Sequence, residues 1–219
     1  MYLQAQMVNH IGQEDYVASL MSPGNNSFMM YGYKKGYPLN SLWGFQYAGV
    51  WHNVDEFERN KFTHSYISNT TTNNATSILG YPRYVDQNHD GIMSDADLIY
   101  LGNSDPILYG GFQNTFTIGN WSIGAYLTYS LGGKLYNYAE LSMSGTYSAN
   151  QYRYMLDSWH PVRNPESDIP RAGTEMRMSP SSFQVHDASY IRLKNVNITY
   201  RWDLSKKSKF LRDVTFGLS

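Results

Sequence analysis

The fold is decided by residues 107–131, which read ILYGGFQNTFTIGNWSIGAYLTYSL. In both halves of this stretch, apolar and polar side chains alternate, and the pair Gly119-Asn120 separates the halves. The apolar members are Leu108, Phe112, Phe116 and Ile118, then Trp121, Ile123, Leu127, Tyr129 and Leu131. A period of two residues is typical of β-strands, and a two-residue Gly-Asn loop commonly joins the strands of a hairpin. The stretch therefore predicts an antiparallel hairpin with one apolar and one polar face.

The length of these strands narrows the fold class. Each half of the hairpin is about eleven residues long, roughly twice the five or six residues usual in globular proteins. Strands of about nine to eleven residues, apolar on one face and small or polar on the other, are typical of transmembrane β-barrels. Trp121 and Tyr129 fit the aromatic girdles of such barrels. We therefore expect an all-β protein that forms part of an antiparallel transmembrane β-barrel.

The alternation returns near the C-terminus with a change of phase. Ile191 and Leu193 share one parity, whereas the apolar residues after Lys194-Asn195 share the other: Val196, Ile198, Tyr200 and Trp202. One extra residue in a β-bulge shifts the register in this way. The sequence predicts a bulge near Lys194-Asn195, and a further strand over residues 214–218.

Composition excludes several classes of protein. The 219 residues carry a formal net charge of −1, so no overall field favours nucleic acid. The absence of cysteine excludes disulfides and thiolate metal sites. Twenty tyrosines suit an aromatic-rich β protein. No apolar run reaches the roughly 18 residues of a membrane-spanning helix. The first eight residues lack the features of a signal peptide, and the sequence stops within a predicted strand, so we expect a fragment of a longer barrel protein.

The stretch from Asp86 to Asp97 has the spacing of a calcium-binding loop. Oxygen-bearing side chains occupy its first, third, fifth and twelfth positions, glycine occupies the sixth, and a backbone carbonyl is expected at the seventh. The predicted ligands are Asp86, Asn88, Asp90, the carbonyl of Ile92, and Asp97. Because aspartate is shorter than the usual glutamate at the twelfth position, we expect weak or partly hydrated Ca²⁺ binding. An acidic surface turn of similar spacing is the alternative.

No catalytic arrangement emerges from the sequence. The six histidines are scattered, and the sequence has no nucleophile elbow, phosphate-binding glycine loop or zinc-protease motif. A glycosidase with two distant carboxylates stays open as an alternative. We therefore expect a protein that is not an enzyme.

Five segments, in this order, resemble the C-terminal part of the SusC/RagA family of TonB-dependent outer-membrane transporters. They are residues 36–51 with Gly36-Tyr37-Pro38-Leu39, the loop 86–97, residues 101–112, Trp159-His160-Pro161 with Asn164-Pro165 and Pro170-Arg171, and Asp187-Ala188-Ser189-Tyr190-Ile191-Arg192-Leu193-Lys194-Asn195. The last segment is the most distinctive. The resemblance covers about residues 28–202.

The resemblance implies a large, plugged antiparallel barrel with long polar extracellular loops, in the outer membrane of a Gram-negative bacterium. Residues 1–219 are then part of its barrel domain, with the plug and the final strands absent from this chain. The partners implied are a SusD-like surface lipoprotein, the TonB complex and outer-membrane lipid, with glycan or peptide as substrate. No substrate-contacting residue is carried over from the family.

The main alternative is a soluble, calcium-supported, carbohydrate-binding β-sandwich. The two folds differ in what covers the apolar face, because a barrel turns it toward lipid and a sandwich buries it beneath a second sheet. The residues that distinguish them are Leu108, Phe112, Phe116, Trp121, Ile123, Leu127 and Tyr129.

Overall fold

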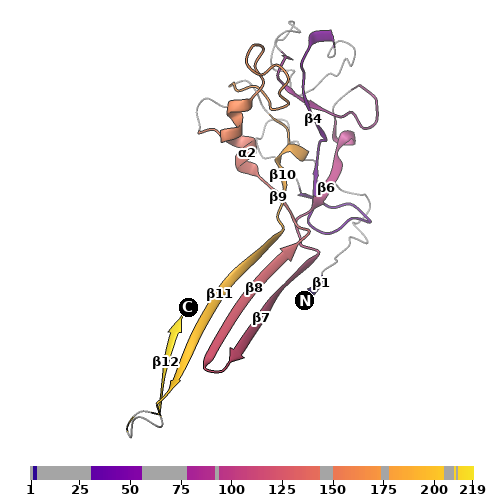
Figure 1. Ribbon diagram of the computed structural model, residues 1–219. Helices are drawn as coiled ribbons and strands as arrows, with labels where there is room; N and C mark the ends of the chain where they lie inside the picture. Colours follow the sequence, from indigo (N-terminus) through magenta and orange to yellow (C-terminus); the bar gives the residue numbers. More distant parts are fainter. Residues whose placement is uncertain are drawn as a thin grey trace. The chain divides into compact units, whose positions relative to one another are not determined.

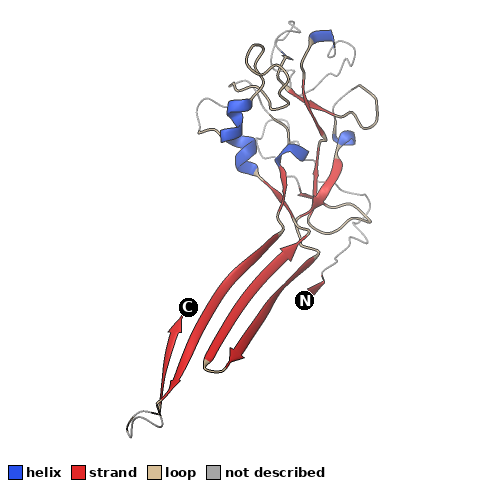
Figure 2. Ribbon diagram, viewed as in Figure 1, coloured by secondary structure: helices blue, strands red, loops and turns tan. Residues whose placement is uncertain are grey.

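The computed structural model describes residues 2–3, 31–55, 78–91, 94–143, 150–173, 178–204, 210 and 212–219. The chain divides into two compact units. Unit 1 comprises Met1–Ala5, Asp105–Lys134 and Asp187–Ser219, and unit 2 comprises Gln6–Ser104 and Leu135–His186. Strands predominate over short helices in the described residues (Figure 2), so the chain is all-β, as predicted.

Unit 1 is an antiparallel sheet with the strand order β1-β7-β8-β11-β12 (Figure 1). Its strands are β1 (Tyr2–Leu3), β7 (Leu108–Ile118), β8 (Trp121–Leu131), β11 (Tyr190–Asp203) and β12 (Asp213–Leu218). The predicted hairpin is confirmed, since β7 and β8 pair from Leu108↔Leu131 to Ile118↔Trp121. Gly119 has a φ of +60° in the two-residue turn, a conformation that glycine adopts without steric cost.

The predicted bulge in β11 is also confirmed. The pairing with β8 shifts between Leu193 and Asn195, so Lys194 is the extra residue. Leu193 lies opposite Leu127, and Val196 lies opposite Ala125. The bulge therefore returns the apolar residues on both sides of it to the same face of the sheet.

Connections of very different length leave the two ends of this sheet. The two-residue turn 119–120 and the link 204–212 join strands at one end. At the other end, residues 4–107 connect β1 to β7 and residues 132–189 connect β8 to β11. Antiparallel pairing requires successive connections to alternate between the two ends, and in this chain the short turns lie at one end and the long connections at the other.

Unit 2 consists of these long connections and contains short strands. A three-stranded sheet has the order β2 (Tyr31–Gly32), β3 (Ser41–Gly44) and β6 (Ile99–Asn103) in the described part of the chain, and β4 (Tyr47–Val50) pairs with β5 (Pro82–Tyr84). Strands β9 (Lys134–Tyr136) and β10 (Val185–Asp187) also pair. The short helices are η2 (Asp95–Asp97), α2 (Tyr138–Met143), η3 (Arg153–Asp157) and η4 (Ser182–Gln184). None of the described helices combines the length and apolar character needed to cross a membrane.

An aromatic core holds unit 2 together. Its buried members are Phe45, Trp51, Ile78, Tyr81 and Tyr84. Residues far apart in sequence meet around it, since Phe45 forms a parallel bridge with Ser181 and its amide donates to the carbonyl of Pro180 at 3.0 Å. Burial raises the pKa of Tyr84 above its ordinary range, so its hydroxyl stays protonated while accepting a 2.9 Å hydrogen bond from the Ser179 amide.

Candidate functional site

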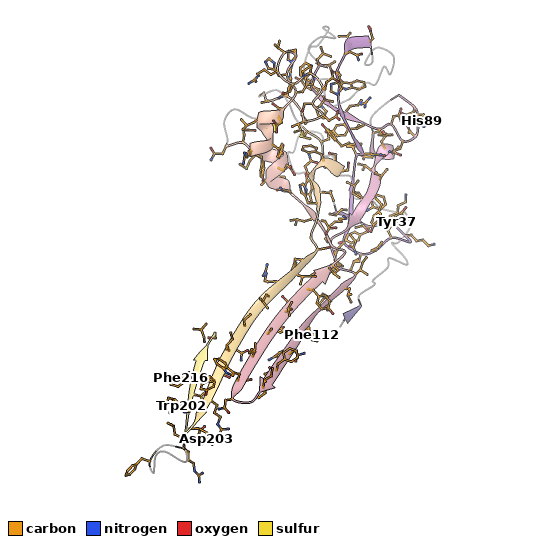
Figure 3. The ribbon with its side chains drawn as sticks, in the orientation of Figure 1. Tyr37, His89, Phe112, Trp202, Asp203 and Phe216 are labelled. Atoms are coloured by element: carbon orange, nitrogen blue, oxygen red, sulfur yellow. The ribbon has the colours of Figure 1, made fainter. Side chains whose placement is uncertain are left out.

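The apolar face of unit 1 is continuous across four strands. Cross-strand pairs place Phe112 opposite Leu127, Ile198 opposite Ile123, and Tyr200 between Trp121 and Phe216. None of the seven residues that distinguish a barrel from a sandwich is buried; Phe112 is 57% exposed and Phe116 is 60% exposed. Figure 3 labels Phe112, Trp202 and Phe216 on three of these strands. Soluble proteins seldom leave an apolar surface of this continuity uncovered.

Aromatic side chains on that face are densest near the short turns. Near the short turns, the rings of Trp121 and Tyr200 lie 4.8 Å apart between centroids, and Trp202 follows two residues later. Toward the long connections, Tyr129 lies opposite Ile191. Phe112 and Leu127 lie between these ends. The distribution agrees with the aromatic girdles of a transmembrane barrel.

The opposite face of the sheet is polar. Thr117, Ser122 and Thr199 are neighbours on successive strands. Close to the short turns, Nε of Arg201 donates to Oδ2 of Asp213 at 3.0 Å. A hollow of about 610 Å³ lies here, lined in part by Asn120, Arg201, Asp203, Arg212 and Asp213.

The calcium-type loop has the predicted sharp turn. Gly91, at the sixth position, has a φ of +78°. The Asp86 carboxylate accepts hydrogen bonds from the amides of His89 at 2.7 Å and Gly91 at 2.9 Å. Desolvation raises the pKa of Asp86, but the hydrogen bonds from the Gly91 and His89 amides outweigh it, so the pKa lies below its ordinary value. The first ligand position is therefore held as a carboxylate that faces into the turn.

The remaining predicted ligands are divided between the surface and the interior. Asn88 and Asp90 bond to each other, with Nδ2 of Asn88 2.8 Å from Oδ2 of Asp90. Asp97 is fully buried, and its two oxygens accept from the amides of Gln87 and Ser94, each at 2.9 Å. Ile92 lies outside the described residues. Asp97 therefore ties the start of the loop to its end.

Ca²⁺ binding by this loop would depend on which of its oxygen atoms are available. Among the described residues, no three acidic or histidine side chains are gathered as a metal site would require. However, a carboxylate has about four lone-pair positions, and each of Asp86 and Asp97 uses two of them for these amides. Oxygen capacity for a hard cation is thus present. Beside the loop, Trp51, Arg83, Tyr84, Asp86 and His89 contribute to a hollow of about 400 Å³.

Residues 159–171 form a loop attached to the aromatic core. Trp159 is buried, and its amide donates to the carbonyl of Ile169 at 2.8 Å. The amide of Arg171 donates to the carbonyl of Gly80 at 3.0 Å, and its guanidinium lies 4.7 Å from the ring centroid of Tyr81. The Trp159 motif of the sequence is therefore a packing anchor.

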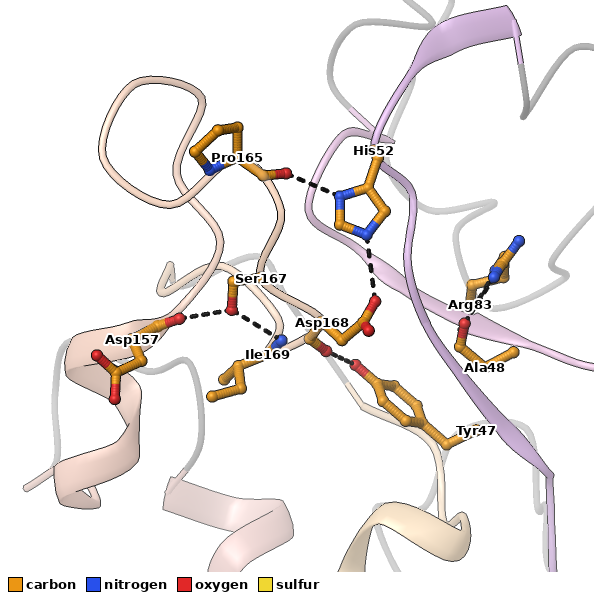
Figure 4. Close-up of polar contacts among 9 residues, drawn as sticks. All are labelled: Tyr47, Ala48, His52, Arg83, Asp157, Pro165, Ser167, Asp168 and Ile169. Atoms are coloured by element: carbon orange, nitrogen blue, oxygen red, sulfur yellow. Dashed lines mark hydrogen bonds and ion pairs between the residues drawn. The ribbon is translucent and has the colours of Figure 1, made fainter.

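A polar cluster fixes the same loop to the strand segment 47–52 (Figure 4). Nδ1 of His52 lies 2.8 Å from the Pro165 carbonyl, and Nε2 lies 3.1 Å from Oδ1 of Asp168. The Tyr47 hydroxyl donates to the Asp168 carbonyl. Burial raises the pKa of Tyr47 above its ordinary range, which keeps this hydroxyl a donor. Beyond the Asn-Pro pair of the loop, no sequence pattern indicates this cluster, because His52 and Asp168 are 116 residues apart.

The most distinctive sequence motif closes the start of β11. The Asp187 carboxylate accepts from the Ser189 amide at 2.7 Å and from Nζ of Lys134 at 3.2 Å. The Ser189 hydroxyl accepts from the Gly132 amide at 2.9 Å. These hydrogen bonds, from Ser189 first and then Lys134, lower the pKa of Asp187 to about 2. The motif therefore fastens the start of β11 to the turn that follows β8.

Comparison with known proteins finds relatives of one kind. No family model matches the chain. It is 30% identical over 196 residues to TonB-dependent receptor P26 of Formosa agariphila, which covers 87% of this chain and 18% of that protein. It is 28% identical over 167 residues to TonB-dependent receptor P3 of the same organism, covering 76% of this chain and 15% of that protein. The chain thus spans less than a fifth of the length of these relatives.

Solved structures share the fold. The RagAB peptide transporter matches 86% of this chain and 18% of its own, with a TM-score of 0.60 and 19% identity. The RagAB peptide importer in its "closed-closed" state matches 98% of this chain and 22% of its own, with a TM-score of 0.64 and 18% identity.

Proposed function

Because the chain belongs to the TonB-dependent receptors and is SusC/RagA-like, we propose that the intact protein imports oligomeric nutrients across the outer membrane of a Gram-negative bacterium. Residues 1–219 are part of its barrel domain, and the plug lies elsewhere in the protein. The relatives are named as receptors and transporters, and the proposal assigns no catalytic step to this chain.

The two-faced sheet of unit 1 carries the proposal. Its apolar face is exposed across four strands, whereas its other face bears threonines, serines and charged residues. Short turns leave one end of the sheet and long connections leave the other. Outer-membrane barrels share all three features, with lipid outside, a polar interior, and long loops on the extracellular side.

We infer a glycan or a peptide as the cargo and a SusD-like surface lipoprotein as the partner. The family resemblance supports the lipoprotein and the use of TonB, and the solved neighbours are named for peptide transport. The outer membrane supplies the lipid that covers the apolar face.

Uptake by the living bacterium tests the proposal. A strain that lacks the receptor gene is supplied with labelled glycan or peptide oligomers, with and without a plasmid copy of the receptor. We expect import only with the receptor and only while TonB is present, and copurification of a surface lipoprotein in detergent. Uptake that is unchanged after deletion, or that continues without TonB, would contradict the proposal.

We further propose that the Asp86–Asp97 loop binds a structural Ca²⁺. Asp86, Asn88, Asp90, the carbonyl of Ile92 and Asp97 would hold the ion, which would supply a cross-link within the loop and no chemistry of transport. The left-handed Gly91 and the inward-facing Asp86 support this assignment.

Calorimetric titration of the intact receptor checks the calcium site. We expect a dissociation constant on the order of 10⁻⁴ to 10⁻³ M, because the short Asp97 side chain weakens closure of the site. Asp86→Ala and Asp90→Ala are expected to remove the heat of binding. Asp105→Ala, which changes an acidic residue outside the loop, is the matched control. Equal heats from all three variants would exclude this loop as the binding site.

A further inference from the structure

The two ring nitrogens of His52 both face hydrogen-bond acceptors. Nδ1 is 2.8 Å from the carbonyl oxygen of Pro165, and Nε2 is 3.1 Å from Oδ1 of Asp168. A carbonyl and a carboxylate can only accept, so both nitrogens must donate if both contacts are hydrogen bonds. A neutral imidazole has one N–H and an imidazolium has two. The geometry is therefore fully satisfied only by the protonated ring.

We propose that His52 is a protonation-dependent clamp on the loop 159–171. The protonated ring bridges Pro165 and Asp168, and loss of a proton leaves one ring nitrogen with its lone pair directed at an acceptor. The contact is complete below histidine's ordinary pKa of about 6.5, and because both acceptors favour the protonated ring it is lost as the pH rises above that value.

The backbone around the clamp is built for close approach. Gly49 has a φ of +88°, and a Cβ there would lie 2.3 Å from Oδ1 of Asp168, so a side chain at this position would displace the carboxylate from its present place. The Tyr47 hydroxyl holds the Asp168 backbone from the same strand. On the far side of the loop, the Ser167 hydroxyl donates to the Asp157 carbonyl and accepts from the Ile169 amide. Tyr47 and Ser167 keep Asp168 within reach of His52 in either protonation state, so the ring can release and rebind it.

Other ionisable groups lie near the clamp and could also contribute to a pH-dependent change in the loop. Tyr84, Asp168, Arg83 and Tyr154 all interact electrostatically with Tyr47. Arg83 donates two hydrogen bonds to the Ala48 carbonyl (Figure 4). Tyrosine and arginine do not change charge between about pH 5 and pH 8. Glu166 and Asp157 are carboxylates of the same region.

The loop itself contains one histidine, His160, and unlike those of His52 its hydrogen bonds require an unprotonated ring nitrogen. Its Nδ1 accepts from the amides of Val162 at 3.2 Å and Arg163 at 3.3 Å, which requires that nitrogen to be unprotonated. The variant His160→Asn keeps a side-chain acceptor at this position and does not titrate. It therefore provides a background in which His52 is the one histidine bonded to the loop that changes charge.

Hydrogen exchange of the intact receptor in detergent tests the clamp. Exchange is measured for peptides that cover residues 157–171 at about pH 5.5 and about pH 8, after correction for the intrinsic pH dependence. We expect exchange about five-fold faster at the higher pH in the His160→Asn background, as the loss of one charge-assisted hydrogen bond implies. His52→Gln should exchange at the fast rate at both values.

The neighbouring carboxylates supply the controls. Asp168→Asn keeps an acceptor oxygen but removes the charge, so it should also abolish most of the pH dependence. Glu166→Gln changes a carboxylate two residues away and should retain the dependence. Equal protection at both pH values in the His160→Asn receptor would overturn the proposal, as would a pH dependence that survives in Asp168→Asn. If His52→Gln does not fold, Asp168→Asn decides the question, and neither result depends on what the receptor transports.

Discussion

Gly80 shows how a single residue positions the Trp159 loop. It has a φ of +78°, and a Cβ at this position would lie 2.4 Å from Cε3 of Trp159 and 3.0 Å from Cβ of Arg171. Its amide donates to the Trp51 carbonyl at 2.9 Å. Two features require glycine at this position. The backbone is left-handed, and the indole ring of Trp159 occupies the space that a side chain would need.

Gly80→Ala is expected to lower the free energy of unfolding by about 3 kcal/mol. A left-handed alanine costs about 1 kcal/mol, and forcing a methyl group against a packed ring adds about 2 kcal/mol. Gly36→Ala is the control, because Gly36 has a φ of +85° and a Cβ added there would have nothing within 4 Å; it should cost only about 1 kcal/mol. The free energies of unfolding of the two variants, from urea titration, place both costs on one scale. Equal costs for both variants would show that the indole ring moves aside.

Asp187 makes the start of β11 sensitive to acid. Its pKa is lowered to about 2 in the folded protein, compared with about 3.9 for a free aspartate. The contribution of Asp187 to stability is therefore complete above about pH 4 and is lost as the pH falls toward 2. We expect pepsin cleavage near residues 187–190 to rise about two-fold as the pH falls from about 4 to about 2, after normalisation to the cleavage of an unstructured peptide. The change is modest because the ion pair of Asp187 with Lys134 is exposed. Asp187→Asn should show no such rise, and a rise of equal size in that variant would assign the effect to another group.

At the scale of the element, the register of β11 depends on one extra residue in its bulge. Lys194 is accommodated by the bulge, and the apolar alternation on either side stays on one face of the sheet. Removing Lys194 would leave Leu193 and Asn195 as ordinary alternating neighbours. Removing a residue outside the bulge would turn every following side chain to the opposite face.

Two single-residue deletions test this account of β11. Deletion of Lys194 should preserve pairing with β8 and leave the amount of folded receptor in the outer membrane nearly unchanged. Deletion of Asn197 should move Ile198, Tyr200 and Trp202 to the polar face and reduce that amount at least ten-fold. Heat-modifiable migration of the receptor in electrophoresis measures the folded fraction. Similar losses from both deletions would show that the bulge itself is needed for assembly.

The elements that could be predicted from sequence are those whose residues carry a local period. The hairpin, the bulge and β12 followed from alternation alone, because each side chain's face is fixed by its place in the strand. Unit 2 has no such period. Its strands are mostly two to five residues long in the described part of the chain, and Phe45 pairs with Ser181 across 136 positions.

The candidate sites also divide into features that are local in the sequence and features that only folding assembles. The calcium-type loop could be located because its ligands fall within twelve consecutive residues, and the turn at Gly91 is as predicted. The roles of Asp97 as a buried cross-link and of His52 as a clamp could not be predicted, because their partners are brought close only by folding. Calcium binding itself stays a prediction.

At the scale of the whole molecule, unit 1 has two faces that require different surroundings. Under the proposed function, its apolar side chains face lipid and its threonines and serines face the barrel interior, so the free-energy cost of an added charge should depend on the face that carries it. Phe112 and Gln113 allow this comparison at mid-strand, since they are adjacent residues of β7 and both are exposed.

Phe112→Arg should therefore destabilise the inserted receptor far more than Gln113→Arg. Arginine on the lipid face costs about 2–4 kcal/mol near the middle of the bilayer, whereas an exposed polar position tolerates substitution within about 0.5 kcal/mol. Urea titration of the receptor folded into phospholipid vesicles gives both values. Phe112→Leu, which stays apolar, separates loss of the ring from gain of the charge and should remain close to the native receptor. A larger cost for Gln113→Arg than for Phe112→Arg would mean that the apolar face packs against protein, and the membrane assignment of this sheet would then fail.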